Sequence, residues 1–206
     1  MLNKHIDPDP IIEFDKWLNE AKDNTEIKIY TAMTLGTVNK HNRPETRTVL
    51  LKGHSQNGFI FYTNSNSKKG KSLKLNPYAS ISFHWEKLGK QINIQGKAVI
   101  QDTTLSDEYF ATRPRGSQIS AWASNQSSAV KNRNELEVIK KKYIQKFEGK
   151  PVPRPPHWNG YIVQPDQIEF WVDRQSRFHD RFLFTRQTKI TKKETKSSWK
   201  MTRLCP

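Results

Sequence analysis

A short basic segment near the C-terminus, SRFHDRF, combines one histidine with two arginines. Read as an extended strand, it places Arg177, His179 and Arg181 on one face, because alternate side chains of a strand point to the same side. Cationic or titratable groups this close repel one another unless a negative charge lies between them. The segment therefore predicts a site for an anion.

Two other stretches carry residues that suit phosphate groups. In RTVLLK, Arg47 and Lys52 leave opposite faces of a predicted strand and would serve two anions or two ends of one site. In YTNSNSKKGK, Ser67, Lys68 and Lys69 fall at a predicted helix N-terminus, where free backbone N–H groups and the helix dipole favour a phosphate. An exposed lysine loop explains this second stretch equally well.

A third basic stretch, YFATRPRGSQISAW, places Arg113 and Arg115 on either side of a proline and follows them with Gly116 and Ser117. These residues offer two planar guanidinium groups and a hydroxyl in a predicted tight turn, which suits recognition of a phosphate. The sequence contains no Walker, GxGxxG, HExxH or GxSxG motif. The six histidines are dispersed, so no metal site is expected, and the single cysteine, Cys205, has no catalytic setting. An organic cofactor would therefore have to supply any reactivity.

Composition limits the class of protein. The 206 residues fit one domain, and ten Phe, six Trp and six Tyr predict an aromatic-rich core despite a hydrophobic fraction of 34%. No run is long enough to span a bilayer, the N-terminus lacks a secretory signal, and a single cysteine agrees with a reducing compartment. We therefore expect a cytoplasmic protein without a membrane partner. The net charge of +15 predicts an anionic partner, although the lysine-rich runs KNRNELEVIKKKYIQKF and TKITKKETK are better interpreted as solvated surface.

The predicted elements would hold these residues on a small barrel. A first helix begins at Pro10, capped by Asp9, and ends near Lys22 within an N-terminal helix region, residues 1–25. Apolar alternation and turn residues predict antiparallel strands in the segments IYTAMTLGTV, TRTVLL, GFIFYTN, YASISFHW, QINIQGKAVI, GYIVQP, IEFWV, RFLFTR and WKMTRL. Many short strands with a few helices outside them indicate a mainly β barrel of the α+β class, in one domain over residues 1–206.

Three further helices are predicted between the strands. The first opens at Ser67 and ends before Pro77, and Thr104 with Asp107 forms a capping-box pattern ahead of the second. The third opens at Asn132. Its apolar stripe, which we expect to pack on the strands, consists of Leu136, Ile139, Tyr143 and Phe147.

Together these stretches resemble the pyridoxine (pyridoxamine) 5'-phosphate oxidases, a family of FMN enzymes that make pyridoxal 5'-phosphate. The similar segments are RTVLLK, GFIFYTN, SKKG, NPYASISFHW, RPRGSQISAWASNQSS, PVPRPPHWNGY, IEFW, RFHDRF and the terminal RLCP, in the order of the family. The resemblance implies an FMN-binding split β-barrel of six strands with helices around it. It also implies a homodimer with FMN at the subunit interface.

The resemblance implies roles for individual residues. The positions similar to FMN-contacting residues, some of them contributed across the dimer, are Arg47, Thr48, Val49, Leu50, Leu51, Lys52, Tyr62, Thr63, Ser67, Lys68, Lys69, Gln91, Gln126, Ser127, Trp171 and Arg181. The positions similar to substrate-binding residues are Lys52, Tyr109, Arg113, Ser117, Arg177, Phe178 and His179. Arg177 and His179 are the implied catalytic residues, and they would act mainly by orienting the substrate.

The implied reaction moves a hydride from C4' of pyridoxine 5'-phosphate or pyridoxamine 5'-phosphate to FMN. Oxygen then reoxidises the cofactor with release of hydrogen peroxide, and the amine also yields ammonia. The product in both cases is pyridoxal 5'-phosphate. The resemblance implies no nucleic-acid partner.

Several features depart from the family pattern. Lys68 stands where the family usually has arginine, which replaces a bidentate phosphate contact by a point charge, and Ser120 stands where glycine is common. Compared with longer members, the sequence starts late, so we expect an N-terminal segment that can close over the substrate to be missing. Residues 187–199 are expected to form an exposed, mobile hairpin insertion.

Two alternatives stay open. One is another split-barrel flavoprotein, such as a flavin reductase, which would have no use for the set of residues implied to bind the substrate. The other is a non-enzymatic protein that binds nucleic acid through its positive charge. A purified protein with flavin colour would argue against the second alternative.

Overall fold

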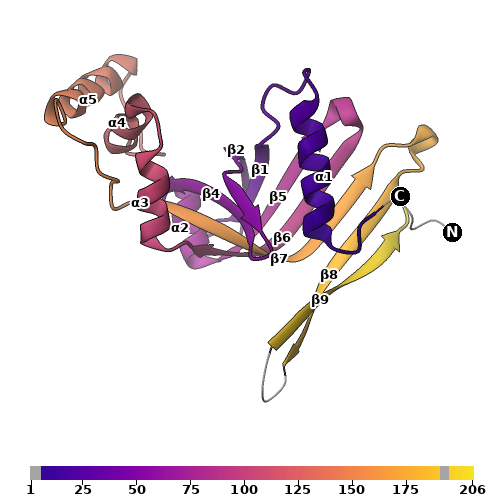
Figure 1. Ribbon diagram of the computed structural model, residues 1–206. Coiled ribbons are helices and arrows are strands. Elements are labelled where there is room, and N and C mark those ends of the chain that lie inside the picture. Colours follow the sequence, from indigo (N-terminus) through magenta and orange to yellow (C-terminus); the bar gives the residue numbers. More distant parts are fainter. Residues whose placement is uncertain (1–5, 191–194) are drawn as a thin grey trace.

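Nine antiparallel strands form one sheet in the part of the chain that the computed structural model describes, residues 6–190 and 195–206 (Figure 1). The strands are β1 (Ala32–Val38), β2 (Pro44–Leu50), β3 (Gly53–Ser55), β4 (Gly58–Asn64), β5 (Tyr78–Trp85), β6 (Lys90–Ile100), β7 (Trp158–Val172), β8 (Asp180–Ile190) and β9 (Thr195–Leu204). Their order is β2-β1-β5-β6-β7-β4-β3, and β9 joins the sheet through β8, which pairs with β7. The mainly β, α+β class expected from the sequence is confirmed, with more strand segments than the six that the resemblance implies.

The long strand β7 divides the sheet into two parts. It pairs with β6 over most of its length, with β4 through its first half and with β8 through its second half. The β6–β7 register shifts between Gln95 and Gly96, where a Cβ on Gly96 would lie 2.0 Å from the carbonyl oxygen of Gln164. Only glycine permits this approach, and the bulge accommodates Pro165 within the strand. For this reason the two predicted strands GYIVQP and IEFWV are one.

Five α-helices and two short 3₁₀ turns accompany the sheet in the described residues. They are α1 (Pro10–Asp23), α2 (Lys68–Leu75), α3 (Thr103–Ala111), α4 (Arg115–Ala123), α5 (Arg133–Lys146), η1 (Glu86–Leu88) and η2 (Gln175–Arg177). The predicted caps Asp9, Ser67 and Asn132 are confirmed, since each side chain accepts a backbone N–H of the first turn. The capping box at Thr104 was wrong, because Asp102 caps α3 and accepts the N–H of Thr104 at 2.7 Å.

The main core lies between α1 and the sheet (Figure 1). Phe14 of α1 is fully buried and meets the edges of Phe59 and Phe83, with ring centroids 4.8 and 5.3 Å away. Trp17, one turn further along α1, meets Phe170 of β7 at 5.0 Å. Burial of each such side chain contributes about 1.5–3 kcal/mol. The aromatic-rich core predicted from composition is confirmed.

A second, smaller core joins α3, α4 and α5 to the start of β7. Its buried residues are Phe110, Ile119, Phe147, Val152 and Trp158. The predicted stripe of α5 does not pack on the strands, because α4 lies between α5 and the sheet (Figure 1). Tyr143 and Phe147 instead meet Trp122 of α4, at 6.1 and 5.5 Å, while Leu136 stays exposed.

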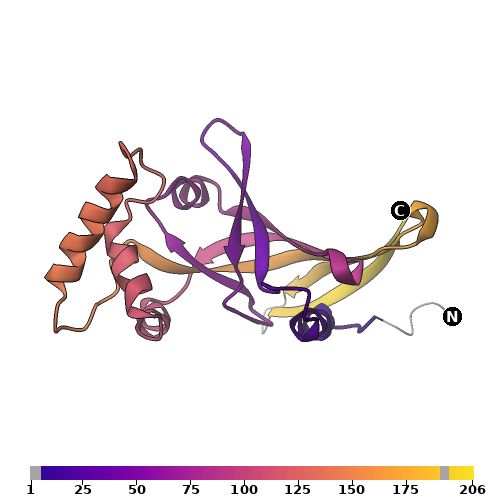
Figure 2. The same cartoon turned by 90° about the horizontal axis from the view of Figure 1, so that it is seen from above.

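The segment SRFHDRF is not extended throughout, so its predicted shared face was wrong. Residues 175–177 form the turn η2, in which Ser176 and Arg177 have φ angles of 57° and 61°. The strand β8 begins only at Asp180. This turn and the helices α3–α5 lie at opposite ends of the molecule (Figure 2).

The C-terminal hairpin pairs as far as Ile190 and Thr195. The tip of the predicted insertion at residues 187–199 lies outside the described residues, so its mobility stays a prediction. Among the helices that the structure describes, none is long and apolar enough to span a membrane.

Candidate active site

A half-buried lysine marks the first half of the candidate site. Lys69 Nζ, in the first turn of α2, lies 3.1 Å from Gln126 Oε1, 3.3 Å from Thr63 Oγ1 and 3.5 Å from Ser67 Oγ. All three partners are neutral, and no carboxylate in the described residues forms an ion pair with Lys69. Burial, and then the positive charge of Arg47, lowers the pKa of Lys69. An anion beside Lys69 would stabilise the charged lysine and so offset both effects on its pKa.

Arg47 brings a second cation to the same place. It lies on the inward face of β2, where Nη1 donates to Thr37 Oγ1 at 2.7 Å and Nη2 lies 3.5 Å from Glu45 Oε2. Burial lowers the pKa of Arg47 as well. Two partly buried cations beside the N-terminus of α2 form a cradle that suits a phosphate group.

The first residues of the α4–α5 connection close this cradle. Ser127, with a φ angle of 76°, accepts the backbone N–H of Lys68 at 3.3 Å through its hydroxyl. Gln126, its neighbour, accepts from Lys69 and Thr63. The structure thus brings together Arg47, Thr63, Ser67, Lys68, Lys69, Gln126 and Ser127 from the predicted cofactor set.

A cavity of about 320 Å³ adjoins the cradle and reaches the predicted substrate residues. It is lined by Thr63 and Gln126 on one side and by Arg113 and Ser117 on the other. The Arg113 guanidinium lies over the ring of Trp158 at 4.7 Å, and its Nη1 is buried without a hydrogen-bond partner in the described residues. Burial lowers the pKa of Arg113. A buried donor without an acceptor is costly, so a ligand acceptor is expected here.

Stacked aromatic rings form one wall of this region. Tyr62 lies 4.2 Å from Tyr109 and 4.8 Å from Trp158, with the rings nearly parallel. The predicted residues Tyr62 and Tyr109 are therefore adjacent. The stack fixes the ring of Trp158 on which Arg113 rests.

Arg115 is not part of this site. The predicted tight turn is the start of α4, and the Arg115 guanidinium turns away to donate to the backbone oxygens of Phe147 and Lys150. It therefore satisfies carbonyl groups after α5. Of the two arginines beside Pro114, only Arg113 faces the cavity.

The second half of the predicted set lies around the turn between β7 and β8. Gln91 pairs with Trp171 and Trp171 with Arg181, so the three form a row across β6, β7 and β8. The ring of His179 lies 4.5 Å from that of Trp171. Arg181 Nε donates to Glu169 Oε1 at 2.7 Å, a bond that raises the pKa of Arg181.

Arg177 and Phe178 complete this group. Arg177 holds its left-handed conformation in η2, and Phe178 is 77% exposed. Figure 2 places η2 and α4 at opposite ends of the elongated chain. Within one copy of the chain, the two halves of the predicted site therefore do not meet.

The remaining predicted residues follow the alternation of β2. Val49 and Leu51 face inward, whereas Thr48, Leu50 and Lys52 are exposed, so Arg47 and Lys52 point to opposite sides as expected. This alternation leaves Lys52 available to a ligand from outside the sheet.

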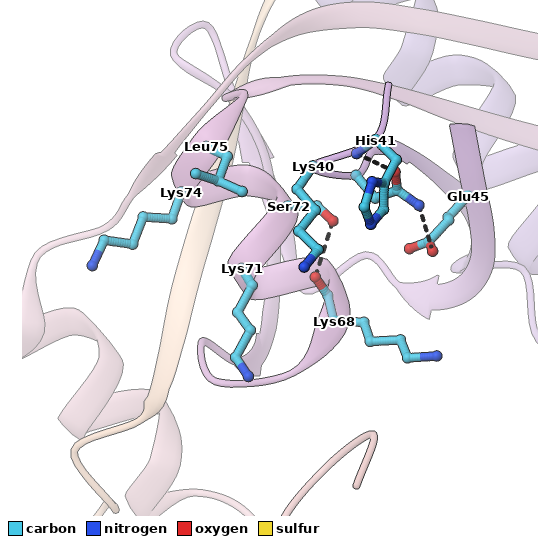
Figure 3. Close-up of a pocket in the computed structure, with 9 residues that line it drawn as sticks. Lys40, His41, Glu45, Lys68, Lys71, Ser72, Lys74 and Leu75 are labelled. Atoms are coloured by element: carbon cyan, nitrogen blue, oxygen red, sulfur yellow. Dashed lines mark hydrogen bonds between the residues drawn. The ribbon is translucent and has the colours of Figure 1, made fainter. Parts of the chain in front are cut away.

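A second groove, of about 550 Å³, lies between α2 and the β1–β2 hairpin. Figure 3 shows His41 and Glu45 on the hairpin side and Lys68, Lys71 and Lys74 on the helix side. Of these residues, only Lys68 belongs to the predicted cofactor set. The groove extends the positive charge of the cradle over the neighbouring surface.

Sequence reasoning missed five residues that line the cavity: Asn64, Ser120, Ala121, Ser124 and Trp158. Ser120 and Ser124 follow Ser117 at helical spacing, so they would have been found had residues 115–123 been predicted as a helix. Trp158 lies in the motif PPHWNGY, where nothing in the spacing shows that an arginine stacks on it.

The half-open antiparallel sheet, with the cradle beside α2, defines a split-barrel protein. A pyridoxamine 5'-phosphate oxidase-related, FMN binding protein from Nostoc punctiforme has the same fold, with a TM-score of 0.70 at 16% identity over 94% of this chain and 97% of that one. In the described residues, no group of three or more His, Cys, Asp or Glu side chains could hold a metal ion.

The chain belongs to the pyridoxamine 5'-phosphate oxidase family. The family model of that description matches residues 21–147, and the model of the pyridoxine 5'-phosphate oxidase C-terminal dimerisation region matches residues 158–206. A pyridoxine/pyridoxamine 5'-phosphate oxidase of Paraburkholderia phytofirmans is 44% identical over 98% of this chain and 91% of the relative. One of Rubrobacter xylanophilus is 46% identical over 88% and 83%. The structure of PhzG from Burkholderia lata has a TM-score of 0.85 at 28% identity, over 97% of this chain and 94% of that one.

Proposed function

We propose that this chain is an FMN-dependent oxidase that converts pyridoxamine 5'-phosphate or pyridoxine 5'-phosphate to pyridoxal 5'-phosphate. The observation that carries the proposal is the buried Nη1 of Arg113, which has no partner in the described residues and lines a cavity beside the cationic cradle. A substrate phosphate supplies the acceptor that this guanidinium lacks. The identities of 44% and 46% to named oxidases support the same substrates.

The cradle fits the phosphate of FMN. Arg47 and Lys69 would hold its charge, Ser127 and the N-terminus of α2 would add hydrogen bonds, and Gln91 could bond the flavin ring. When bound, FMN supplies the acceptor for a hydride from C4' of the substrate and passes the electrons to oxygen.

The chain's own residues bind and orient the substrate. Arg113 and Ser117, with Tyr109 and Lys52, would hold the substrate phosphate. Arg177 and His179 would set the position of the pyridine ring, since a hydride transfer depends mainly on the distance and angle between the reacting atoms.

The proposal includes a homodimer. The two halves of the predicted site lie at opposite ends of one chain, and residues 158–206 match a dimerisation region. In a twofold dimer the α4 end of one subunit can meet the β7–β8 turn of its partner. Each active site would then contain residues of both chains.

A second candidate follows from the likeness to PhzG, whose structure was determined with tetrahydrophenazine-1-carboxylic acid. A carboxylate would also suit the Arg113 guanidinium. The identity to PhzG is only 28%, compared with 44% and 46% to the named oxidases, so the phosphorylated pyridine is the preferred substrate.

The test uses FMN-loaded protein, oxygen and pyridoxamine 5'-phosphate, with aldehyde and hydrogen peroxide followed together. We expect the two products in equal amounts, and the same with pyridoxine 5'-phosphate. Turnover of a reduced phenazine carboxylate without formation of aldehyde from either pyridine would favour the second candidate. Failure to oxidise any of the three with FMN bound would contradict the proposal.

A further inference from the structure

Thr37 of β1 holds the guanidinium group of Arg47 from inside the fold. Thr37 is only 2% exposed, and its Oγ1 accepts a hydrogen bond from Nη1 of Arg47 at 2.7 Å. The same nitrogen donates to the backbone oxygen of Leu35 at 3.3 Å. Leu35 is paired with Arg47 in the β1–β2 register and lies two residues before Thr37. Both acceptors therefore belong to one strand, and together they fix the place of Nη1.

Glu45 makes a weaker contact with the other end of the guanidinium group. Its Oε2 lies 3.5 Å from Nη2 of Arg47, while its Oε1 accepts Asn39 Nδ2 at 3.0 Å. A guanidinium group has five N–H donors, and the contacts with Thr37, Leu35 and Glu45 engage at most three of them. Arg47 is thus held in place while donors remain for a ligand.

The residue type at position 37 is explained by Arg47 and not by packing. The neighbouring inward positions of β1 hold Met33 and Leu35, which are apolar and buried. Valine has the branched shape of threonine and would fill position 37 without a polar atom. A buried hydroxyl is unfavourable unless it is hydrogen-bonded, and in the described part of the chain Arg47 supplies that bond. The hydroxyl therefore serves the guanidinium group.

An arginine that is held in position before its ligand arrives loses less conformational entropy on binding. Arg47 also lies close enough to Lys69 for its charge to lower the pKa of Lys69. Repulsion between these two cations would turn a free guanidinium group away from the cradle. The bond from Arg47 to Thr37 opposes that movement.

We propose that Thr37 is a positioning residue that presents Arg47 to the phosphate of FMN. Thr37 acts through Arg47, so its shielded hydroxyl needs no contact with the cofactor. This role rests on the proposed function, in which Arg47 and Lys69 hold that phosphate. It adds to the site a residue that the predicted cofactor set does not contain.

The test compares FMN with riboflavin, which is the same flavin without the phosphate. Quenching of flavin fluorescence gives the dissociation constants of both flavins for the wild type, Thr37→Val and Thr37→Ser. We expect Thr37→Val to weaken FMN binding about tenfold and to leave riboflavin binding unchanged, because the lost bond orients a group that meets the phosphate alone. Thr37→Ser keeps the hydroxyl and should restore wild-type binding of both flavins.

A double-mutant cycle tests whether Thr37 acts through Arg47. In the background of Arg47→Met, the further change Thr37→Val should leave the FMN dissociation constant unchanged, because the group that Thr37 positions is gone. The matched control is Thr34→Val, which replaces an exposed threonine of the same strand and should leave both constants unchanged. Denaturant unfolding of each variant without FMN reports whether it is folded.

Three results would overturn the proposal. One is an unchanged FMN affinity in Thr37→Val. Another is an equal loss of FMN and riboflavin affinity, which would indicate a general loosening of the site. The third is an effect of Thr37→Val that persists in the background of Arg47→Met.

Binding and turnover separate this role from the proposed function. If the wild type binds FMN more tightly than riboflavin but oxidises neither pyridine substrate, the proposed substrates are wrong, and the two dissociation constants still decide the role of Thr37. If the wild type binds FMN no more tightly than riboflavin, the cradle does not hold the phosphate, and the role of Thr37 is contradicted with it.

Discussion

Two arginines only two positions apart have different tasks in this molecule. Arg115 satisfies backbone carbonyl groups that follow α5, whereas Arg113 stacks on Trp158 and keeps one nitrogen without a partner in the described residues. Their charges are equal, so charge alone could not distinguish them. The difference lies in the acceptors within reach: backbone carbonyl groups after α5 for Arg115, and none in the described residues for Nη1 of Arg113.

Replacing Arg113 by methionine should weaken substrate binding without loss of the cofactor. Methionine keeps most of the side-chain volume against Trp158 but removes the guanidinium, so a charge-assisted contact worth about 1.5–3 kcal/mol is lost. We expect KM for pyridoxamine 5'-phosphate to rise about 10- to 100-fold. Steady-state kinetics and the flavin absorbance of the purified variant measure the two quantities.

The control for this variant is Arg133→Met on the exposed face of α5, where the arginine pairs only with Glu137 in the described residues. Its KM should equal that of the wild type. An unchanged KM in Arg113→Met would show that Arg113 does not bind the phosphate.

The lowered pKa of Lys69 predicts how FMN binding depends on pH. A bound phosphate favours the charged lysine and raises its pKa again, so binding takes up a proton at alkaline pH. The affinity for FMN should therefore fall as the pH rises through the lowered pKa toward the ordinary value of 10.5. The FMN phosphate itself stays doubly charged there, because its second pKa is about 6. Fluorescence titration of FMN across this range measures the effect.

Lys69→Arg provides the comparison, since arginine keeps its charge throughout. Its FMN affinity should change much less over the same range. If the FMN affinity of Lys69→Arg and of the wild type depends on pH in the same way, a group other than Lys69 causes the effect. In the protein without FMN, the depressed pKa predicts stability that increases with pH in this window, because the unfolded chain binds more protons there.

At the scale of elements, the sequence predicted what depends on neighbours along the chain. The caps Asp9, Ser67 and Asn132 were found because each acts within three residues of its own position. The turn η2 was missed because the bonds around it, such as the one from the Arg174 backbone N–H to Nδ1 of His179, involve side chains whose positions alternation does not predict. Alternation alone would extend the strand through residues 176–179.

In the candidate site, too, the sequence predicted some features and missed those that depend on distant residues. Resemblance located residues of both halves, but spacing could not show that they lie at opposite ends of the chain. The stacking of Arg113 on Trp158 also joins residues from α3–α4 and β7 that are far apart in sequence. Such contacts follow from packing, which a single sequence does not specify.

Two glycines in first helical turns give a prediction about α2. A Cβ on Gly70 would lie 2.3 Å from the carbonyl oxygen of Ser65, whereas a Cβ on Gly116 of α4 would have no atom within 4 Å. Gly70→Ala should therefore displace the loop before α2, weaken FMN binding and destabilise the fold by about 1–3 kcal/mol. Gly116→Ala should be neutral or stabilising by up to about 1 kcal/mol, since alanine favours helices.

Denaturant unfolding and FMN titration of both variants measure these effects. Equal stability and equal FMN affinity in the two variants would contradict the close packing of Gly70 against Ser65.

At the scale of the whole molecule, the separation of the two site halves is the most informative feature. The cradle and Arg113 lie near α2 and α4, while His179 and Arg177 lie at the β7–β8 turn (Figure 2). The dimerisation region matched at residues 158–206 includes that turn. The proposed catalysis therefore requires the assembly of two chains.

Subunit complementation tests this central claim most directly. Arg113→Met and Arg177→Ala are each purified, then unfolded and refolded together so that the chains mix. Random association makes about half of the dimers mixed, and one of the two sites in each mixed dimer is intact, so roughly a quarter of the wild-type oxidation of pyridoxamine 5'-phosphate should return. If the mixture is no more active than the separate variants, while refolded wild type regains its activity, both residues serve the same chain's site and the account is wrong.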